Sequence, residues 1–333
     1  MSVKRLRFVE CGEFPTTFDT SVVFRLTPQE TSEAYYNERV DRNIGWITKN
    51  MQDTLRSSTI GVAGCGGMGG LLAERAVRTG IGRVKLADNE SFDLTNTNRQ
   101  FAARRDTIGT SKAIATAESL RAISNDTELH VYPQGITNET VAHFIESCDL
   151  IFAEIEIFAL EAYVLLHQHA RRAGIDIIDG LVVGWGTNLF YYTPGGYRVE
   201  DMLGFPGTDT QALEQIKHLA QQIKAGSFDA RTNAANRIIN AFVPNLPTYT
   251  EDGSDRALVL ERLRQGKASI VAPSPLLATG VAMVRAILYL LQRGAGCNLS
   301  VEPLPEAPGF LSVDMAKCTI ERVTRERVGN AVW

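Results

Sequence analysis

The stretch GCGGMG, residues 64–69, constrains the fold of this chain more than any other feature. It follows the apolar run TIGVAG (59–64) and opens the helical segment MGGLLAERAVRTG (68–80), after which RVKLAD (83–88) has a strand pattern again. This order predicts a β-strand, an α-helix and a second, parallel strand. Parallel strands joined by helices form sheets that helices cover on both faces, so we expect an α/β fold with a mostly parallel sheet.

The glycines of this stretch predict a nucleotide site. Gly64, Gly66 and Gly69 form the pattern G-x-G-x-x-G at the start of the helix. Side chains there would block the tight turn and the approach of a phosphate to the free N–H groups of the helix N-terminus. Asp88 ends the second strand, where a carboxylate can accept hydrogen bonds from ribose hydroxyls. The pattern therefore favours a Rossmann-like nucleotide-binding domain and leaves mononucleotide and dinucleotide ligands open. Cys65, inside the turn, is expected to pack rather than react.

Further along the chain, strand and helix patterns keep alternating to about residue 196. Two strand-like runs in 176–196, separated by Gly-Trp-Gly, leave that alternation and predict a mixed sheet edge. Four segments are expected. Residues 1–57 form a leader of a strand and a helix, with helical sequence over 27–58, and residues 58–196 form the nucleotide-binding domain. Residues 197–272 form a helical insertion that faces the substrate, and residues 273–333 form a C-terminal helix and strands that complete the core.

Composition excludes several classes of protein. The formal net charge is -4 without a long block of one sign, so we expect no nucleic-acid partner. The N-terminus lacks the apolar core of a signal peptide, and the most apolar segment, 274–291, contains Arg285 and is predicted to be a buried helix. We therefore expect a cytoplasmic protein without a membrane partner. The 5 cysteines include no C-x-x-C pair, so no structural zinc is expected.

Polar residues at fixed spacings follow the second strand. They are Asp88, Glu90, Asn96, the run Asn98-Arg99-Gln100, and Gly109 with Lys112. Together with the glycine turn they resemble the signature of the ThiF/MoeB/HesA adenylyltransferases, the superfamily that includes the ubiquitin-activating enzymes. The resemblance runs over about residues 35–196 and includes VDRN (40–43), similar to an arginine-bearing segment of that family.

This resemblance implies an enzyme that adenylates a carboxylate with ATP, giving an acyl adenylate and pyrophosphate. Negative charge on the phosphorus and the leaving group must then be stabilised by cations. By the resemblance, the nucleotide would be bound by the glycine turn including Gly67, by Asp88 and nearby Glu90 at the ribose, by Asn96, Arg99 and Gln100, and by Lys112 at the α-phosphate. The resemblance also implies a homodimer in which Arg42, with Arg39 as the alternative, reaches into the neighbouring subunit as an arginine finger.

Two positions depart from the family pattern. Glu156 stands where the family has the aspartate that binds Mg²⁺, which leaves reduced activity or an inactive homologue open. No cysteine lies between Cys148 and Cys297, the region where relatives that form thioesters carry theirs. We therefore expect no thioester step, and attack on the adenylate by a nucleophile of the substrate or a partner.

The expected substrate is a peptide or natural-product precursor, with the C-terminus of a ubiquitin-like sulfur-carrier protein as the alternative. Two other functions stay open. An NAD-dependent oxidoreductase would also use Asp88, but it leaves Arg99 and Lys112 without a role. A non-catalytic scaffold would keep the fold and lose Mg-ATP binding.

Overall fold

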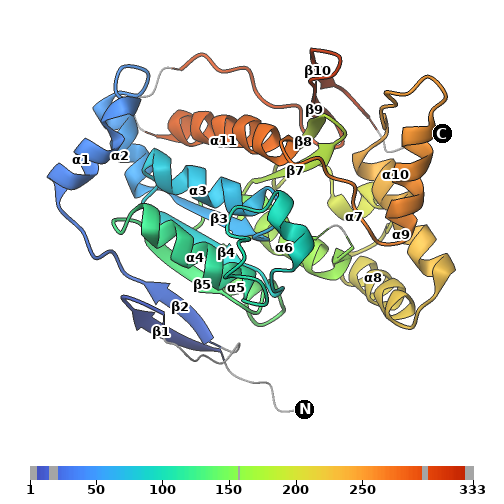
Figure 1. Cartoon of the computed structure of the whole chain (residues 1–333), viewed down its shortest axis with the longest axis horizontal. Helices are drawn as coiled ribbons and strands as arrows, with labels where there is room; N and C mark the ends of the chain where they lie inside the picture. The colour runs from blue at the N-terminus through green and yellow to red at the C-terminus, as the bar shows by residue number, and fades with distance from the viewer. Residues whose placement is uncertain (1–5, 15–21, 157, 295–298, 327–333) are drawn as a thin grey trace. The chain divides into compact units, whose positions relative to one another are not determined.

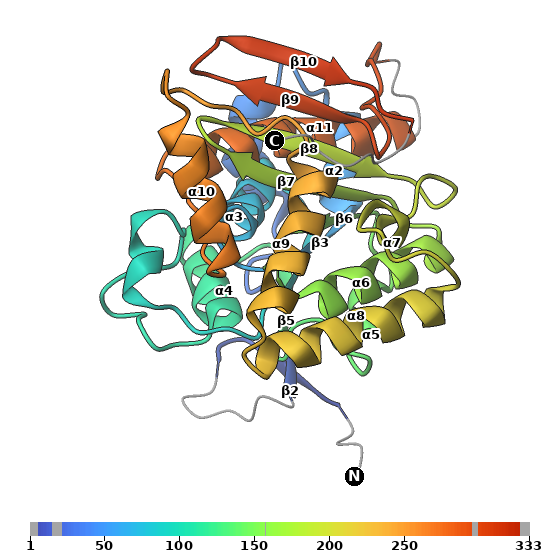
Figure 2. The same ribbon diagram turned by 90° about the vertical axis from the view of Figure 1, so that its right-hand side faces the viewer.

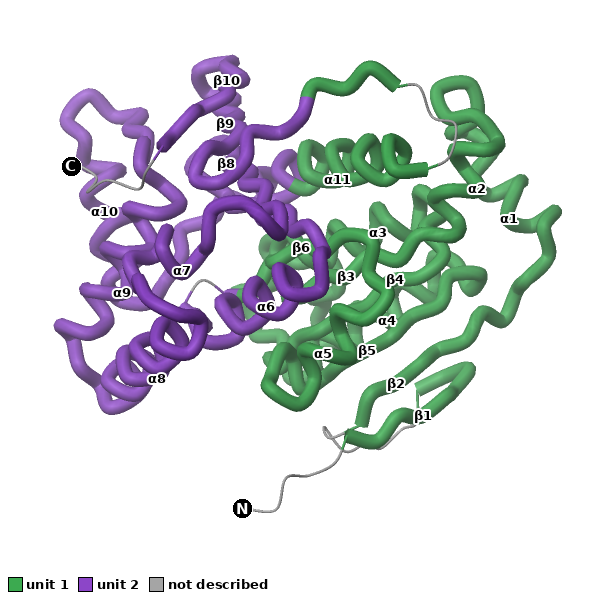
Figure 3. The backbone as a smooth tube through the Cα atoms, turned by 180° about the vertical axis from the view of Figure 1, so that it is seen from behind, with its two compact units in different colours: residues 1–155, 279–302 green, residues 156–278, 303–333 purple. Residues whose placement is uncertain are grey.

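The computed structural model describes residues 6–14, 22–156, 158–294 and 299–326. The chain forms two compact units, coloured separately in Figure 3. Unit 1 consists of residues 1–155 and 279–302, and unit 2 of residues 156–278 and 303–333. This division cuts across the expected segments, because the stretch 58–196 is split after Ile155. The expected division into four segments assigns a role to each segment, and these roles remain predictions.

Unit 1 contains a sheet with the strand order β1-β2-β5-β4-β3-β6. The strands are β1 (Arg7–Cys11), β2 (Val22–Leu26), β3 (Thr59–Ala63), β4 (Arg83–Ala87), β5 (Glu128–Tyr132) and β6 (Leu150–Ala153). The pairs β5–β4, β4–β3 and β3–β6 are parallel, whereas β2 runs antiparallel to β5. The predicted parallel core of an α/β fold is thus confirmed.

The order of these strands defines where a ligand is expected. From β3 the chain proceeds to β4 and then β5 on one side, and β6 returns to the other side of β3. In open α/β sheets, ligands bind outside the carboxyl ends of the strands at such a switch point. The residues that follow β3 and β6 therefore occupy the position of a ligand site.

Helices cover both faces of the parallel strands. A Cβ at Gly69, the first residue of α3 (Gly69–Thr79), would lie 3.3 Å from the side chain of Val62, whereas one at Gly61 would lie 3.2 Å from Phe144 of α5 (Val141–Ile145). Because side chains alternate along a strand, α3 and α5 lie on opposite faces. Helix α4 (Lys112–Ile123) packs beside α3, as Figure 1 shows. The prediction of helices on both faces is confirmed.

The leader differs from the single helix expected over 27–58. It forms α1 (Glu33–Val40), the 3-10 helix η1 (Asp41–Asn43) and α2 (Lys49–Ser57). Gly45 has a φ of 114°, and the Thr48 side chain accepts a hydrogen bond from Met51 N as the N-cap of α2. A left-handed glycine and a new N-cap end one helix and start another, so the prediction of one continuous helix was wrong.

Unit 2 contains an antiparallel sheet and a set of polar helices. Its strands are, in order, β7 (Ile177–Val183), β8 (Gly186–Tyr192), β9 (Phe310–Asp314) and β10 (Thr319–Val323). Its helices are α6 (Leu160–Ala173), α7 (Val199–Met202), α8 (Asp209–Lys224), α9 (Phe228–Phe242) and α10 (Ser254–Arg264). Figure 2 shows α8 and α9 meeting end to end at an angle. The antiparallel pair β7–β8 confirms the expected mixed edge.

Helix α11 (Ser274–Arg293) contributes residues to both units. Within the described ranges it is the single helix whose length and composition would allow it to cross a membrane. About half of this segment is buried inside the protein, whereas Leu276 and Val284 are exposed. The helix predicted to be buried at 274–291 is therefore buried along one face.

Candidate nucleotide site

The glycine turn is shaped by contacts that no larger residue could make. Gly64 has a φ of 102°, and a Cβ on it would lie 2.0 Å from the carbonyl oxygen of Glu154, just after β6. A Cβ on Gly69 would lie 1.8 Å from the carbonyl oxygen of Gly64. These two glycines are therefore required by packing, because they let the turn after β3 lie against the residues after β6.

Asp88 fixes the glycine turn from the end of the neighbouring strand β4. Its Oδ2 accepts a hydrogen bond from Cys65 N at 2.6 Å, and its Oδ1 accepts one from Glu90 N at 2.8 Å. Burial raises the pKa of Asp88, and these two backbone donors act in the opposite direction. Each carboxylate oxygen keeps a second lone pair, so Asp88 can hold the turn and still accept a hydroxyl of a ligand.

Cys65 is part of the core rather than a nucleophile. Its side chain is buried, and this burial raises the pKa of the thiol well above its ordinary value, with the charge of Asp88 acting in the same direction. A thiol in these surroundings stays protonated and unreactive. The expectation that Cys65 packs is confirmed.

Lys112 lies at the start of α4 and is joined to Glu90. Its Nζ lies 2.6 Å from Glu90 Oε2, and its backbone N donates to Glu90 O at 2.8 Å. A bridge between Ser91 and Ser111 continues this pairing. The Lys112 side chain is only 7% exposed, whereas that of Glu90 is 49% exposed. The Lys112 ammonium is therefore held in a fixed place at the start of α4, and its partner Glu90 is the more exposed of the two side chains.

Asn96 shapes the loop that precedes Arg99. Its Oδ1 accepts a hydrogen bond from Asp93 N at 3.1 Å, while Asp93 Oδ1 accepts one from Asn96 N at 3.2 Å. This reciprocal capping box starts the 3-10 helix η2 (Leu94–Asn98). Asn96 thus has a structural task, and its contact with phosphates stays a prediction.

Arg99 and Gln100 carry polar atoms that no described residue satisfies. Arg99 Nη1 donates to Thr95 O at 3.1 Å and to Asn98 Oδ1 at 2.9 Å, but its buried Nε has no partner among the described residues. The buried Oε1 of Gln100 likewise has none there. Gln100 Nε2 would lie 3.9 Å from a Cβ on Gly66, so this side chain borders the glycine turn. Burial lowers the pKa of Arg99. Buried polar atoms are nearly always bonded to protein or to water, so water or a bound ligand would complete the hydrogen bonds of these two.

Comparison with known proteins identifies the family. A model described as the ThiF family matches residues 40–327. The chain belongs to the ThiF family. Among curated relatives of this family member, tRNA threonylcarbamoyladenosine dehydratase from Escherichia coli (strain K12) is 41% identical over 117 residues, 35% of this chain and 43% of the relative. Sulfur carrier protein ThiS adenylyltransferase from Bacillus subtilis (strain 168) is 28% identical over 146 residues, 43% of each chain. The chain thus spans less than half the length of either relative.

Two solved structures share the ThiF fold over most of the chain. PaaA superimposes with a TM-score of 0.57 at 15% identity and covers 89% of this chain and 76% of its own. E. coli MccB, solved with ATP, gives a TM-score of 0.56 at 17% identity and covers 90% of this chain and 74% of its own. At this level of identity, the likeness establishes the fold.

The two arginines of the leader have different surroundings in this ThiF chain. Arg39 Nε lies 2.9 Å from Asp126 Oδ2, and its Nη1 donates to Val77 O at 2.8 Å, which makes it part of the packing of α1. Arg42 is exposed in η1, ahead of exposed Trp46. None of the described contacts joins Arg42 to the glycine turn. Of the two candidates for an arginine finger, Arg42 is the one with a side chain available to another molecule.

Glu156, the predicted metal ligand, is the first residue of unit 2. Its carboxylate is exposed, and Oε2 accepts a hydrogen bond from Phe158 N at 2.7 Å. No group of three or more His, Cys, Asp or Glu side chains in the described ranges could hold a metal ion. A site for Mg²⁺ would therefore depend on phosphate oxygens as well as on Glu156, and this role of Glu156 stays a prediction.

Sequence reasoning identified the polar residues around the turn but missed how they are held. It gave no role to Asp93, the partner of Asn96 in the capping box, or to the pairing of Ser91 with Ser111. The sequence carries a signal for the first, because an acid three residues before an asparagine fits the spacing of a cap. It carries none for the second, since backbone pairing between irregular segments leaves no pattern of residue types.

Proposed function

We propose that this ThiF-family protein binds ATP at the glycine turn and adenylates a carboxylate. The supporting observation is the pair of buried polar atoms without described partners, Arg99 Nε and Gln100 Oε1, in neighbouring residues of which Gln100 borders the glycine turn at Gly66. The bound ATP of E. coli MccB and the name of the ThiS adenylyltransferase support the same ligand and reaction class.

In the proposed reaction, a carboxylate oxygen attacks the α-phosphorus of ATP, and the bond to the pyrophosphate oxygen breaks. Charge increases at the phosphorus centre and on the leaving group, so fixed cations stabilise the transition state. Lys112 supplies a point charge, which must exchange its contact with Glu90 for phosphate oxygens. Arg99 supplies planar N–H donors suited to phosphate. Asp88 accepts a ribose hydroxyl while it holds the turn.

Two further parts complete the proposal. The exposed carboxylate of Glu156 has the oxygen chemistry that Mg²⁺ prefers and would hold it together with phosphate oxygens. Arg42 would come from the second subunit of a homodimer, and exposed Trp46, at 95%, and Ile44, at 53%, offer apolar area beside it for that contact.

The proposed substrate is a peptide or natural-product precursor, whose adenylate is attacked directly and without a thioester. The absence of cysteine between Cys148 and Cys297 supports the direct route. A structure of the similar-fold protein MccB with AMPCPP and MccA supports a substrate larger than a metabolite. The C-terminus of a sulfur-carrier protein is the alternative that the experiment below distinguishes.

The test is Mg-ATP binding by isothermal titration, followed by mass spectrometry of AMP release with synthetic peptides and with a carrier protein. We expect Arg99→Ala and Lys112→Ala each to slow AMP release by at least about a hundredfold, as for the loss of one charge-stabilising donor. Arg105 is an exposed arginine on the neighbouring loop, and Arg105→Ala is the matched control. It should change neither Mg-ATP binding nor AMP release.

Three outcomes contradict the proposal. If the wild-type chain does not bind Mg-ATP, the protein is a non-catalytic scaffold. If the chain binds a nicotinamide cofactor and changes its fluorescence, the protein is an NAD-dependent oxidoreductase. Equal AMP release by wild type, Arg99→Ala and Lys112→Ala would remove these residues from the site.

A further inference from the structure

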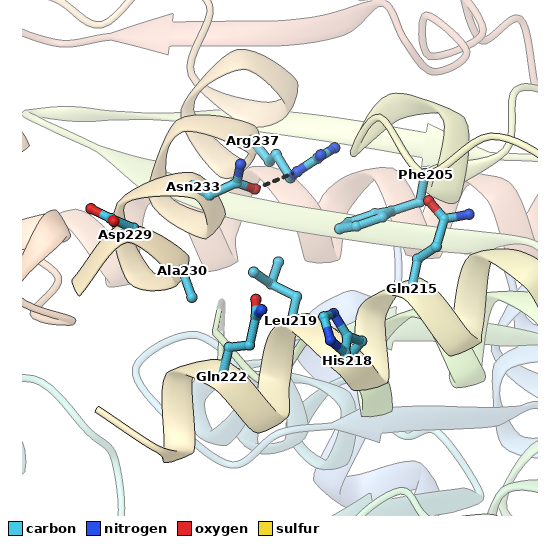
Figure 4. A pocket seen from close by; sticks show the side chains of 9 residues that line it. All are labelled: Phe205, Gln215, His218, Leu219, Gln222, Asp229, Ala230, Asn233 and Arg237. Atoms are coloured by element: carbon cyan, nitrogen blue, oxygen red, sulfur yellow. Dashed lines mark hydrogen bonds between the residues drawn. The ribbon is translucent and has the colours of Figure 1, made fainter. Parts of the chain in front are cut away.

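A groove within unit 2, between α8 and α9, carries polar side chains that adenylation does not use (Figure 4). Its volume is about 380 Å³, which lies in the range of small-ligand pockets, roughly 300–1,000 Å³. Polar side chains line both walls, and the floor is apolar. The α8 wall has Gln215, His218 and Gln222, the α9 wall has Asp229, Asn233 and Arg237, and the floor has Phe205, Leu219 and Ala230.

One end of the groove is held rigidly and is cationic. The Arg237 guanidinium carbon lies 4.3 Å from the ring centre of Phe205. Arg237 Nε donates to Asn233 Oδ1 at 2.7 Å, and Nη1 donates to the carbonyl oxygens of Leu203 at 3.0 Å and Gly204 at 2.7 Å. Nη2 makes no hydrogen bond to any residue that the structure describes. A preorganised guanidinium with a remaining donor is suited to a carboxylate.

The other end of the groove is anionic. Asp229 lies in the first turn of α9 and is exposed. It precedes Arg237 by eight residues, which at 1.5 Å per residue places the two positions about 12 Å apart along the helix. An extended peptide rises about 3.3 Å per residue. Two of its side chains four residues apart point to the same face of the peptide and would therefore span about the distance from Asp229 to Arg237.

Amide side chains lie between and beside these charged ends. In Figure 4, Gln222 lies near Ala230, toward the Asp229 end, and Gln215 lies beside Phe205, toward the Arg237 end. An amide offers both donors and acceptors, which match the N–H and C=O groups of a peptide main chain. The spacing of charges and the distribution of amides thus fit one extended chain.

We propose that the α8–α9 groove binds an extended peptide segment that carries an acidic and a basic side chain four residues apart. The acidic side chain pairs with Arg237 and the basic one with Asp229. The inference rests on the proposed function in one respect, because it takes the bound segment as a part of the peptide substrate other than the carboxylate that reacts.

The first experiment selects ligands without ATP. A phage-displayed library of random twelve-residue peptides is panned on the full chain, and the enriched sequences are determined. We expect them to contain an acid and a base at the stated spacing, in either order. Failure to enrich any peptide, or enrichment without this charge pair, overturns the proposal.

The second experiment reverses one charge. An enriched peptide is synthesised with a fluorophore, and its affinity is measured by fluorescence anisotropy. Asp229→Lys should weaken binding at least about fivefold, because it removes an exposed ion pair and also places two like charges opposite each other. Replacing the peptide's base by glutamate should restore binding. Glu214→Lys makes the same charge change on an exposed α8 residue outside the groove and should have no effect.

If wild type, Asp229→Lys and Glu214→Lys bind the selected peptide equally well, the proposal that the α8–α9 groove binds it is wrong. Since these measurements use no nucleotide, they are independent of adenylation. A chain that binds the selected peptides but releases no AMP counts against the proposed reaction, whereas AMP release that Asp229→Lys leaves unchanged, with peptide binding also unchanged, counts against the groove alone.

Discussion

Gly64 and Gly66 lie in the same turn, but their substitution by alanine should have different consequences. A Cβ at Gly64 meets the Glu154 carbonyl at 2.0 Å in a left-handed conformation, whereas one at Gly66 meets Gln100 Nε2 at an ordinary 3.9 Å. We expect Gly64→Ala to lower the free energy of unfolding by about 3 kcal/mol. Gly66→Ala should lower it by less than about 1 kcal/mol but weaken ATP binding at least about tenfold, because the methyl group occupies space on the ligand side.

Urea denaturation and isothermal titration separate these two effects. If Gly66→Ala binds ATP as the wild type does, the nucleotide does not approach this part of the turn. If Gly64→Ala is as stable as the wild type, the close contact between the turn and the residues after β6 is absent in solution.

At the scale of single residues, the structure brings several of the expected site residues close together, whereas their roles toward a nucleotide stay predictions. Asp88, Glu90 and Lys112 were expected at one nucleotide site from the resemblance to the adenylyltransferases, and the structure joins Lys112 to Glu90 and the backbone of Glu90 to Asp88. The bond from Cys65 N to Asp88, by contrast, involves a backbone amide, and main-chain donors are the same at every residue except proline. Such a contact leaves no trace in the pattern of side chains.

At the scale of elements, α6, β7 and β8 together bury an unusual polar cluster in unit 2. Tyr163 donates a short hydrogen bond to Asp179 Oδ2, and the His167 ring lies 4.6 Å from the rings of Tyr163 and Tyr192. Burial raises the pKa of Asp179 to about 7 and lowers the pKa of His167 to about 3. Asp179 is therefore protonated below about pH 7, and His167 is neutral above about pH 3.

These two shifts oppose each other in the dependence of stability on pH. Protonated Asp179 contributes stability that is present below about pH 4 and lost as the pH rises to about 7. Neutral His167 contributes stability that is present above about pH 6.5 and lost as the pH falls toward 3. Between about pH 4 and 6.5 the two slopes have opposite signs and nearly cancel.

In the variant Asp179→Asn, only His167 of this pair should make the free energy of unfolding depend on pH. Relative to wild type, the free energy of unfolding of the variant should rise by about 1.4 kcal/mol per pH unit between about pH 4 and 7, the equivalent of one proton. Urea denaturation at a series of pH values measures this difference. Parallel curves for wild type and variant would mean that Asp179 is ionised in the folded protein.

The sequence predicted strands well where runs of apolar residues mark them. It predicted helix ends less well where a single residue causes the end. Strand β3 is fully buried and was expected at nearly its observed position, and so was β4, which is buried apart from Arg83. The break at 44–48 was not, because one glycine inside a helical pattern does not by itself end a helix, and the left-handed φ of Gly45 cannot be read from its residue type.

At the scale of the whole molecule, the proposed arginine finger requires two chains. If Arg42 of one subunit serves the nucleotide bound by its partner, Arg42→Ala and Lys112→Ala chains should each be inactive as homodimers. A mixture of the two should recover activity, because a heterodimer has one intact site. With random exchange of subunits we expect about a quarter of the wild-type rate of AMP release, since half the dimers carry one of two sites.

The mixture is measured after reversible unfolding and refolding together, with sedimentation to verify dimers. Mixing Lys112→Ala with Lys112→Ala,Arg42→Ala is the control and should stay inactive. No recovery in the first mixture would mean that Arg42 acts within its own chain or has no part in the reaction.

The path of the chain through its two units sets a rule for engineering. Unit 1 needs residues 279–302 in addition to 1–155, and unit 2 needs residues 303–333 in addition to 156–278 (Figure 3). Neither is encoded by an uninterrupted stretch of the gene. A stop codon after Ile155 would remove part of unit 1 with all of unit 2, and a premature stop anywhere in 156–302 would leave both halves incomplete. To produce either half on its own, the two coding pieces would have to be joined by a new linker.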